Sequence, residues 1–122
     1  MSYKIVIHPD FIELKHFGYI DFPEVERARK EVSDRLITHK LNSLLVDATE
    51  MGKRLSSEEE YRLFTTHSQV LPFGTKIAII IQESTISLED ARYYSTISDI
   101  YATKLKFFSN RESAIEWFRA TK

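Results

Sequence analysis

Three short apolar runs dominate the pattern of hydrophobic and polar positions in this chain. Each run is followed, after a brief polar stretch, by residues that typically start a helix. The runs cover residues 44–46, 77–81 and 105–108, and the helix starts that follow them are Ser56, Ser87 and Ser109. Strands and helices that alternate in this way are typical of βαβ units on a parallel sheet. The run 77–81 has no polar alternation, so we expect both faces of that strand to be covered.

The amino-terminal part predicts a β-hairpin. Two strand-like segments, residues 3–8 and 11–17, flank Pro9 and Asp10, which are typical turn residues. A turn at these two residues fixes the register of the strands and forms one antiparallel edge of the sheet. The opposed pairs are then Ile7 with Ile12, Ile5 with Leu14, and Tyr3 with His16.

Capping signals predict the first helix. Asp21 is a suitable N-cap, and Pro23 follows in the first turn, where a missing N–H is tolerated. We expect this helix to fade near His39 and Lys40. Its apolar stripe consists of Val25, Ala28, Val32 and Leu36.

Similar signals predict three further helices. Ser56 or Ser57 caps the second, since each has a Glu three residues later, and the Pro-Phe-Gly sequence at 72–74 ends it. The third runs from Ser87 to near residue 104, and the last begins at Ser109 or Asn110. The fold class is therefore α/β: a mixed, mainly parallel five-stranded sheet, formed by the hairpin and three βα units, with four helices in one domain over residues 1–122.

Composition narrows the classes of function. Seventeen basic residues face eighteen acidic ones, which argues against a general nucleic-acid binder. The chain has no cysteine, and no two of its four histidines have the spacing of a metal site. We therefore expect no metal and no cofactor. No apolar run is long enough to cross a bilayer and no signal-peptide core is present, so we expect a cytoplasmic protein.

The order of elements resembles the STAS-like domains, and in particular the SpoIIAA-like branch of small stand-alone bacterial proteins. The resemblance covers nearly the whole chain. It is carried by the Phe-Gly-Tyr-Ile segment at 17–20, Leu-Leu-Val-Asp at 44–47, Pro-Phe-Gly-Thr-Lys-Ile-Ala at 72–78 and the ending at 107–118. It implies a regulatory or binding module and not a catalyst. It also implies same-handed crossovers, which gather helices on one side of the sheet.

The resemblance draws attention to the segment after the second strand of the predicted parallel sheet. In the anti-sigma-factor antagonists a phosphorylatable Ser or Thr follows an Asp within the motif Asp-Ser-Ser/Thr-Gly. Here the matching residues are Asp47-Ala48-Thr49-Glu50. The adjacent Ser and the Gly are missing, so Thr49 is the residue that is left to occupy the acceptor's place.

Two polar groups of residues are candidates for a ligand or partner surface. The first is Asp47, at the expected carboxyl end of a central strand, where open α/β sheets bind ligands. The simpler interpretation is that Asp47 binds backbone amides of a following loop, expected over residues 48–55. The second group, Lys53, Arg54, Ser56 and Ser57, could hold an anion at a helix amino end. However, three Glu residues at 58–60 would repel an anion there, which favours simple helix capping.

Aromatic residues form another candidate. Tyr94 and its neighbours on the third helix could line an apolar pocket together with Met51, Phe64 and Phe73. Aromatic residues at helical spacing are also typical of an ordinary core.

These observations favour a non-enzymatic module that engages a protein partner or a small ligand near the carboxyl ends of the strands. The expected surface comprises residues 47–57, the corner at 72–74 and the start of the third helix, residues 85–94. An alternative is a carrier or sensor of a lipid-like molecule, because the fold is similar to the Sec14 domain. A further alternative is a small enzyme, which needs Asp47, Lys53, His67 and Tyr94 to converge. A homodimer is a further possibility, because the strands at 44–46 and 77–81 are apolar on both faces, and either a helix or a second copy of the chain must cover the second face.

Overall fold

The computed structural model describes residues 2–52, 55–82, 87–101 and 103–120. Its elements alternate as the pattern predicts. They are β1 (Tyr3–Ile7), β2 (Ile12–Gly18), α1 (Phe22–His39), β3 (Ser43–Met51), α2 (Ser57–Val70), β4 (Lys76–Ile80), α3 (Leu88–Ile100), β5 (Lys104–Phe108) and α4 (Arg111–Ala120). No helix in the described ranges is long and apolar enough to span a membrane.

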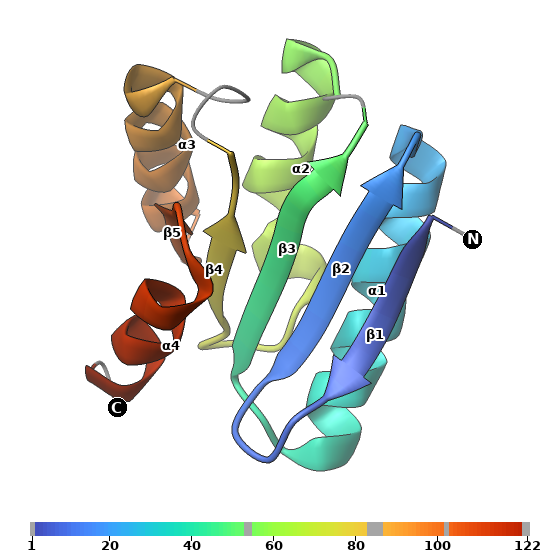
Figure 1. Ribbon diagram of the computed structural model, residues 1–122, viewed down its shortest axis with the longest axis vertical. Helices are drawn as coiled ribbons and strands as arrows, with labels where there is room; N and C mark the ends of the chain where they lie inside the picture. The colour runs from blue at the N-terminus through green and yellow to red at the C-terminus, as the bar shows by residue number, and fades with distance from the viewer. Residues whose placement is uncertain (1, 53–54, 83–86, 102, 121–122) are drawn as a thin grey trace.

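The five strands form one mixed sheet in the order β1-β2-β3-β4-β5 (Figure 1). β1 pairs antiparallel with β2, and the other neighbours pair in parallel. The predicted hairpin register is confirmed in full: Ile7 lies opposite Ile12, Ile5 opposite Leu14, and Tyr3 opposite His16. The predicted fold class is therefore confirmed.

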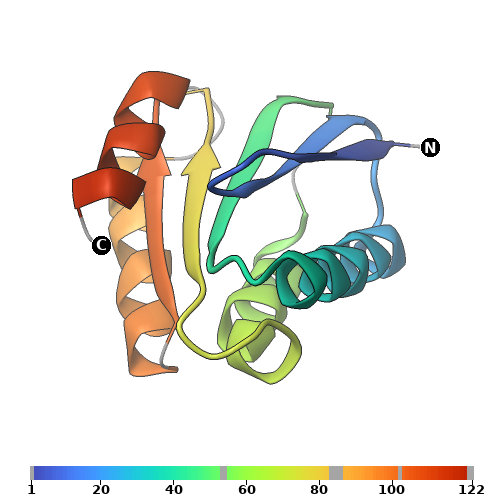
Figure 2. The same cartoon turned by 90° about the horizontal axis from the view of Figure 1, so that it is seen from below.

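Three helices cover one face of the sheet, and α4 alone lies on the other (Figure 2). The larger core lies between the sheet and α1, α2 and α3, with fully buried side chains such as Ile12, Val32, Leu36 and Ile77. A smaller core lies under α4 and contains Phe11, Leu45, Ala78, Ile80, Ala114 and Phe118. Both faces of β4 are therefore covered, as its uninterrupted apolar run predicts.

The predicted helix starts are correct. Asp21 accepts a hydrogen bond from the backbone N–H of Glu24 at 2.9 Å, which satisfies an otherwise free donor in the first turn of α1. Ser56 caps α2 in a reciprocal capping box with Glu59, and Ser87 caps α3. Lys40 ends α1 in the left-handed region at a φ of 54°.

The predicted end of the third strand is wrong. β3 does not stop at Asp47 but continues through residues 48–51, which the sequence assigns to a loop. β2 is long enough to pair with this extension, since Phe17 lies opposite Glu50 and Gly18 opposite Met51. No helix covers the second face of this part of the sheet (Figure 1), so strand residues on that face are polar and look like a loop in the sequence.

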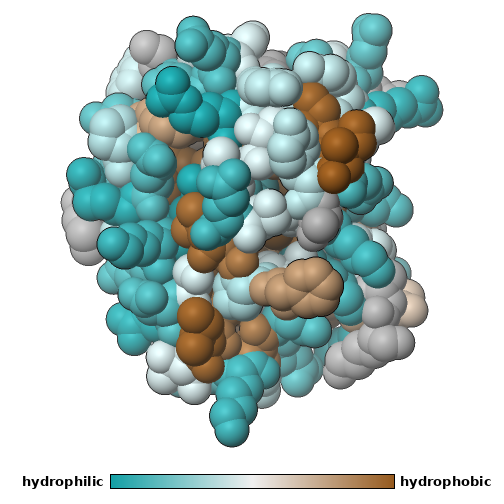
Figure 3. Space-filling view, turned by 180° about the vertical axis from the view of Figure 1, so that it is seen from behind, coloured by the Kyte–Doolittle hydropathy of each residue, from teal (hydrophilic) through white to brown (hydrophobic). Residues whose placement is uncertain are grey.

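The apolar strands were expected to need cover on their second face, from a helix or from a second copy of the chain, and α4 provides part of this cover. Leu45, Ala78 and Ile80, whose second-face burial motivated a homodimer, are covered by α4. The helix-covered side of the molecule is mostly hydrophilic, with separate hydrophobic patches (Figure 3). Of the two covers that the sequence left open, a helix or a second copy, these strands have the helix; self-association itself stays a prediction.

Replacing the Phe118 ring tests the cover that α4 provides. Phe118 is buried against β4 and packs near Phe11, so Phe118→Ala removes a large apolar contact and leaves a cavity. We expect a loss of about 3–5 kcal/mol in the free energy of unfolding, measured by urea denaturation. Ile37→Ala, at an exposed position of α1, is the matched control and should change stability by less than about 0.5 kcal/mol. A Phe118→Ala variant as stable as the control would contradict this packing.

Candidate functional site

Asp47 stabilises an irregularity in the middle of β3. From the pair Lys15–Asp47 to the pair Phe17–Glu50, β2 advances two residues and β3 advances three, so β3 contains a bulge. The Asp47 carboxylate accepts hydrogen bonds from the backbone N–H of Thr49 at 3.0 Å and from its hydroxyl at 2.6 Å. The backbone carbonyl of Thr49 in turn accepts the side-chain amide of Gln82 at 2.8 Å. Asp47 therefore binds a nearby amide, which is the simpler of its two predicted roles.

The hydrogen bond to Asp47 makes Thr49 an unfavourable phosphoacceptor. The Thr49 hydroxyl is half-buried and donates to a carboxylate, so a phosphate on its oxygen would lie against a like charge. Ser56 and Ser57, by contrast, are exposed at the start of α2. Lys53 and Arg54 lie outside the described residues.

Ion pairs lie on the face of β1, β2 and β3 opposite α1 and α2. We call it the open sheet face, because α4 covers it only in part, at Leu45. Glu13 accepts hydrogen bonds from Arg111 at 2.6 Å and from His8 at 2.7 Å. Burial alone would raise the pKa of Glu13, but the bonds from Arg111 and His8 outweigh it and hold the pKa below its ordinary value. Lys15 forms an ion pair with Glu50, and this bond raises the pKa of Lys15. The open sheet face is thus a paired, mixed-charge surface.

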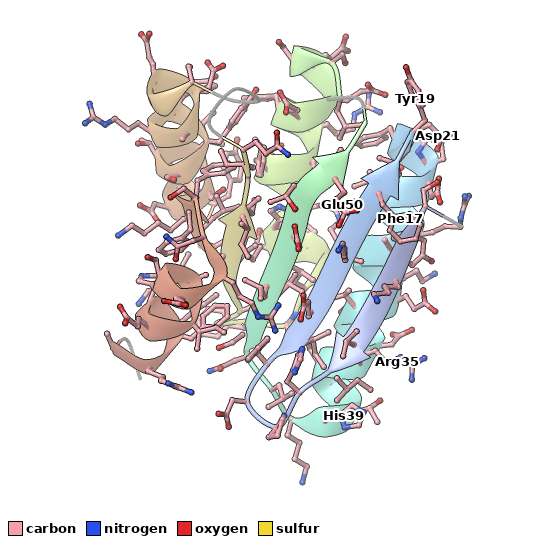
Figure 4. All side chains as sticks on the ribbon, viewed as in Figure 1. Phe17, Tyr19, Asp21, Arg35, His39 and Glu50 are labelled. Atoms are coloured by element: carbon pink, nitrogen blue, oxygen red, sulfur yellow. The ribbon has the colours of Figure 1, made fainter. Side chains whose placement is uncertain are left out.

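The carboxyl ends of β2 and β3 are held together where the open sheet face ends. The backbone N–H of Gly52 donates to the carbonyl of Gly18 at 2.8 Å. Gly18 has a φ of 70°, and a Cβ on Gly52 would lie 3.3 Å from the Gly18 backbone, so both positions favour glycine. Figure 4 shows Tyr19 at the end of β2, near Asp21 and beyond Phe17 and Glu50. We call Phe17, Gly18, Tyr19, Glu50 and Gly52 the β2–β3 corner.

Two residues predicted for the ligand or partner surface, Phe73 and Tyr94, do not lie at the carboxyl ends of the strands on the surface of the protein. Phe73 is 97% exposed, but it lies in the connection from α2 to β4, at the amino ends of the parallel strands. It is therefore at the opposite edge of the sheet from Ser56 and Ser57. Tyr94 is only 4% exposed, packs against Phe64, and donates its hydroxyl to Glu60 at 3.0 Å. Tyr94 belongs to the core. Thr85, also part of the expected surface, lies outside the described residues.

A cavity of about 130 Å³ lies between the sheet and the helices α1 and α2. Its walls are mostly apolar and include Met51 and Phe64, two of the six residues expected to line a pocket; Tyr93, Tyr94, Tyr101 and Phe73 are not among its lining residues. Its polar lining residues are His16 on β2, Arg29 on α1, and Glu60 and His67 on α2. This cavity is on the helix-covered side, whereas Asp47 and Glu13 are on the open sheet face.

Burial keeps both cavity histidines neutral. Burial lowers the pKa of His16 to about 4 and that of His67 to about 3, and the Arg29 guanidinium further lowers the pKa of His67. Arg29 donates from Nη1 to the Leu63 carbonyl at 3.0 Å and to the Thr66 hydroxyl at 2.9 Å, and lies 3.3 Å from His67 Nδ1.

The groups required for an enzyme do not converge. Asp47 is on the open sheet face, while His67 and Tyr94 lie on the helix-covered side of the sheet. Lys53 lies outside the described residues. Within the described ranges, no group of three metal-ligating side chains comes together.

Sequence reasoning missed Arg29 and the partners of Glu13. Arg29 is four residues after Val25 and three before Val32, so it lies on the apolar stripe of α1. A charged residue on such a stripe is a usable signal of a buried polar site. The contact between Glu13 and Arg111 joins residues 98 positions apart, and no local pattern predicts it.

Comparison with solved structures finds the same architecture elsewhere. An uncharacterised DUF3478-family protein with a SpoIIAA-like fold, from Shewanella loihica PV-4, matches at 20% identity and a TM-score of 0.57, over 96% of this chain and 92% of that one. An anti-sigma factor antagonist from Mycobacterium paratuberculosis matches at 11% identity and a TM-score of 0.63, over 97% and 93%. The anti-sigma factor antagonist SpoIIAA in its unphosphorylated form matches at 12% identity and a TM-score of 0.61, over 97% and 98%.

The chain therefore has a SpoIIAA-like fold, as the sequence pattern predicts. At these identities the likeness establishes the fold. In comparisons of sequence, no family model and no curated protein matches the chain.

The buried histidines predict a loss of stability on acidification. Their folded pKa values lie below the ordinary value of 6.5, so below pH 6.5 the unfolded chain binds protons that the folded chain does not. The contribution of these two histidines to stability is fully present above pH 6.5 and is lost as the pH falls toward their folded pKa values of about 4 and about 3. From pH 7 to pH 5 we expect each histidine to cost about 2 kcal/mol of unfolding free energy.

Urea denaturation of variants at both pH values measures this effect. His67→Gln should reduce the loss between pH 7 and pH 5 by about 2 kcal/mol, because glutamine does not titrate. Ile37→Ala, at an exposed position that carries no titratable group, should leave the loss unchanged. Equal losses in His67→Gln and the unmodified chain would show that His67 is not buried in its neutral form.

Proposed function

We propose that this chain is a non-enzymatic regulatory module that binds a protein partner through the β2–β3 corner. Two of the similar solved structures are named anti-sigma factor antagonists, which supports a regulatory role. The separation of Asp47 from His67 and Tyr94 by the sheet supports a binding function over catalysis.

The observation that carries the proposal is the exposed ring of Tyr19. This side chain is 76% exposed, although the backbone on both sides of it is fixed. On one side the Gly18 carbonyl accepts Gly52, and on the other the Ile20 side chain is buried and Asp21 caps α1. A rigid, exposed tyrosine loses little conformational entropy on binding, and tyrosine is enriched among residues that dominate interface energies.

The surroundings of Tyr19 define the partner's chemistry. In Figure 4 Asp21 lies near Tyr19, and the half-buried Phe17 and Glu50 lie further back along β2 and β3. An interface of this kind has an aromatic centre and a polar rim. The partner is therefore a protein with an apolar pocket for the Tyr19 ring and hydrogen-bond donors at its margin.

The cavity supports a second function, the sensing or carriage of an apolar ligand. Met51 lines the cavity and lies between Glu50 and Gly52 of the β2–β3 corner. A ligand in the cavity and a protein at the corner would thus contact neighbouring residues at the end of β3. The two functions are compatible.

Affinity capture from the native host tests the protein-binding function. The baits are the unmodified chain, Tyr19→Ser and Tyr93→Ser, the last being a matched exposed tyrosine on α3. The partner should be retained by the unmodified chain and by Tyr93→Ser, and lost with Tyr19→Ser. With the purified partner, Tyr19→Ser should raise Kd by about tenfold or more in calorimetry.

Two outcomes would contradict the proposal. One is a partner retained equally by Tyr19→Ser and the unmodified chain, which would place the interface elsewhere. The other is that no protein is retained by the unmodified chain. Circular dichroism of the three baits confirms that differences in capture do not arise from unfolding.

A further inference from the structure

The cavity behind the sheet contains polar groups that no residue of the described chain satisfies. Within the described ranges, the side-chain nitrogen atoms Arg29 Nε and His16 Nδ1 are buried without a hydrogen-bond partner. Both residues line the cavity, and they come from the adjacent elements α1 and β2. Arg29 is 6% exposed and His16 is 5% exposed. Buried polar atoms without partners are rare in native proteins and call for a missing partner.

Arg29 indicates the charge of that partner. Its guanidinium is buried, and its hydrogen bonds at Nη1 go to a carbonyl and a hydroxyl, which are neutral groups. The neighbouring His67 is also neutral and accepts at Nδ1, because arginine can only donate. A buried guanidinium is normally paired with a carboxylate or phosphate. An anion at Nε would provide this pair.

His16 fits the same anion. Its imidazole is neutral, so one ring nitrogen carries a proton and the other does not. In the tautomer protonated at Nδ1, it donates a hydrogen bond from the position that lacks a partner. Arg29 Nε–H and His16 Nδ1–H would then be two donors at the wall of one cavity.

The rest of the lining indicates an apolar body for the ligand. Except for His16, Arg29, Glu60 and His67, the walls consist of aliphatic, methionine and phenylalanine side chains. A dry apolar cavity of similar volume can hold a benzene-sized molecule, so about 130 Å³ suits a ligand of about six to nine heavy atoms.

Glu60 is the one acidic residue of the lining, and its position leaves the Arg29 site free for an anion. Glu60 accepts the Tyr94 hydroxyl at 3.0 Å, on the side of α2 that faces α3. Arg29 contacts α2 at Leu63, Thr66 and His67, one to two turns further along the helix. At 1.5 Å per residue, Glu60 and His67 are about 10 Å apart along the axis.

We propose that this cavity binds a small apolar monocarboxylate, with its carboxylate at Arg29 Nε and His16 Nδ1 and its hydrocarbon part between the sheet and α2. The proposal specifies the ligand class of the second function above and is independent of the protein partner. Its failure would leave the Tyr19 interface untouched.

A pair of ligands with one difference tests the proposal on the unmodified protein. Hexanoate and 1-hexanol have the same chain length, but only hexanoate carries a carboxylate. In isothermal titration at pH 7, hexanoate should bind at least about tenfold more tightly than 1-hexanol, because charge-assisted hydrogen bonds are stronger than neutral ones. Equal affinities, or no binding of either ligand, would overturn the proposal and leave a cavity that holds water or remains empty.

Three variants locate the binding site. Arg29→Gln should reduce hexanoate affinity by about tenfold or more and change 1-hexanol affinity by less than about threefold. Arg35→Gln, an exposed arginine on the same helix, is the matched control and should change neither. Ala48→Met fills the cavity from β3 and should abolish binding of both ligands. Hexanoate binding that survives Ala48→Met would place the site elsewhere and contradict the proposal, even if Arg29→Gln fails to fold.

Discussion

The order of the strands is the constraint on which the rest of this structure depends. β2, β3, β4 and β5 are neighbours in the sheet in the same order as in the chain, and all are parallel. Each connection must therefore return to the start of the next strand, and helices α1, α2 and α3 do so over the same face (Figure 2). The second face is left to α4, the last element of the chain, and α4 is too short to cover all of it. The two faces of the central strands consequently lie in different environments.

This asymmetry divides the chemistry of the protein between the two sides of the sheet. On the open sheet face, charged groups are paired with each other, as in the contacts of Glu13 with His8 and Arg111. On the helix-covered side, neutral histidines and the Arg29 guanidinium lie in an apolar environment, where water does not compensate an unpaired group. Met51, the last residue of β3, links the two sides: it lines the cavity and lies between Glu50 and Gly52 of the β2–β3 corner.

The parts of this structure that could be predicted from the sequence are those with local signals. The hairpin register follows from the turn, and the starts of α1, α2 and α3 follow from their capping residues. The predictions failed where the environment of a residue depends on distant elements. The extension of β3 carries polar residues because α4 ends before it, and Tyr94 is buried because α2 packs over it. Phe73 was assigned to the wrong end of the sheet, although its position just before β4 already places it at the amino end of that strand. The burial of Arg29 could have been predicted from its position on the apolar stripe of α1. The lack of a hydrogen-bond partner at its Nε could not, because it depends on the residues of other elements that pack around it.

The central claim is the proposal that the cavity on the helix-covered side binds an anion through Arg29 Nε and His16 Nδ1, which have no hydrogen-bond partner among the described residues. Nitrogen-15 NMR of the Arg29 side chain and the His16 ring, recorded with and without hexanoate, measures these groups directly. The account predicts a downfield shift and slower solvent exchange of the Arg29 Nε–H, together with a His16 ring protonated at Nδ1, when hexanoate is added. Unchanged signals of both residues at saturating hexanoate would contradict it.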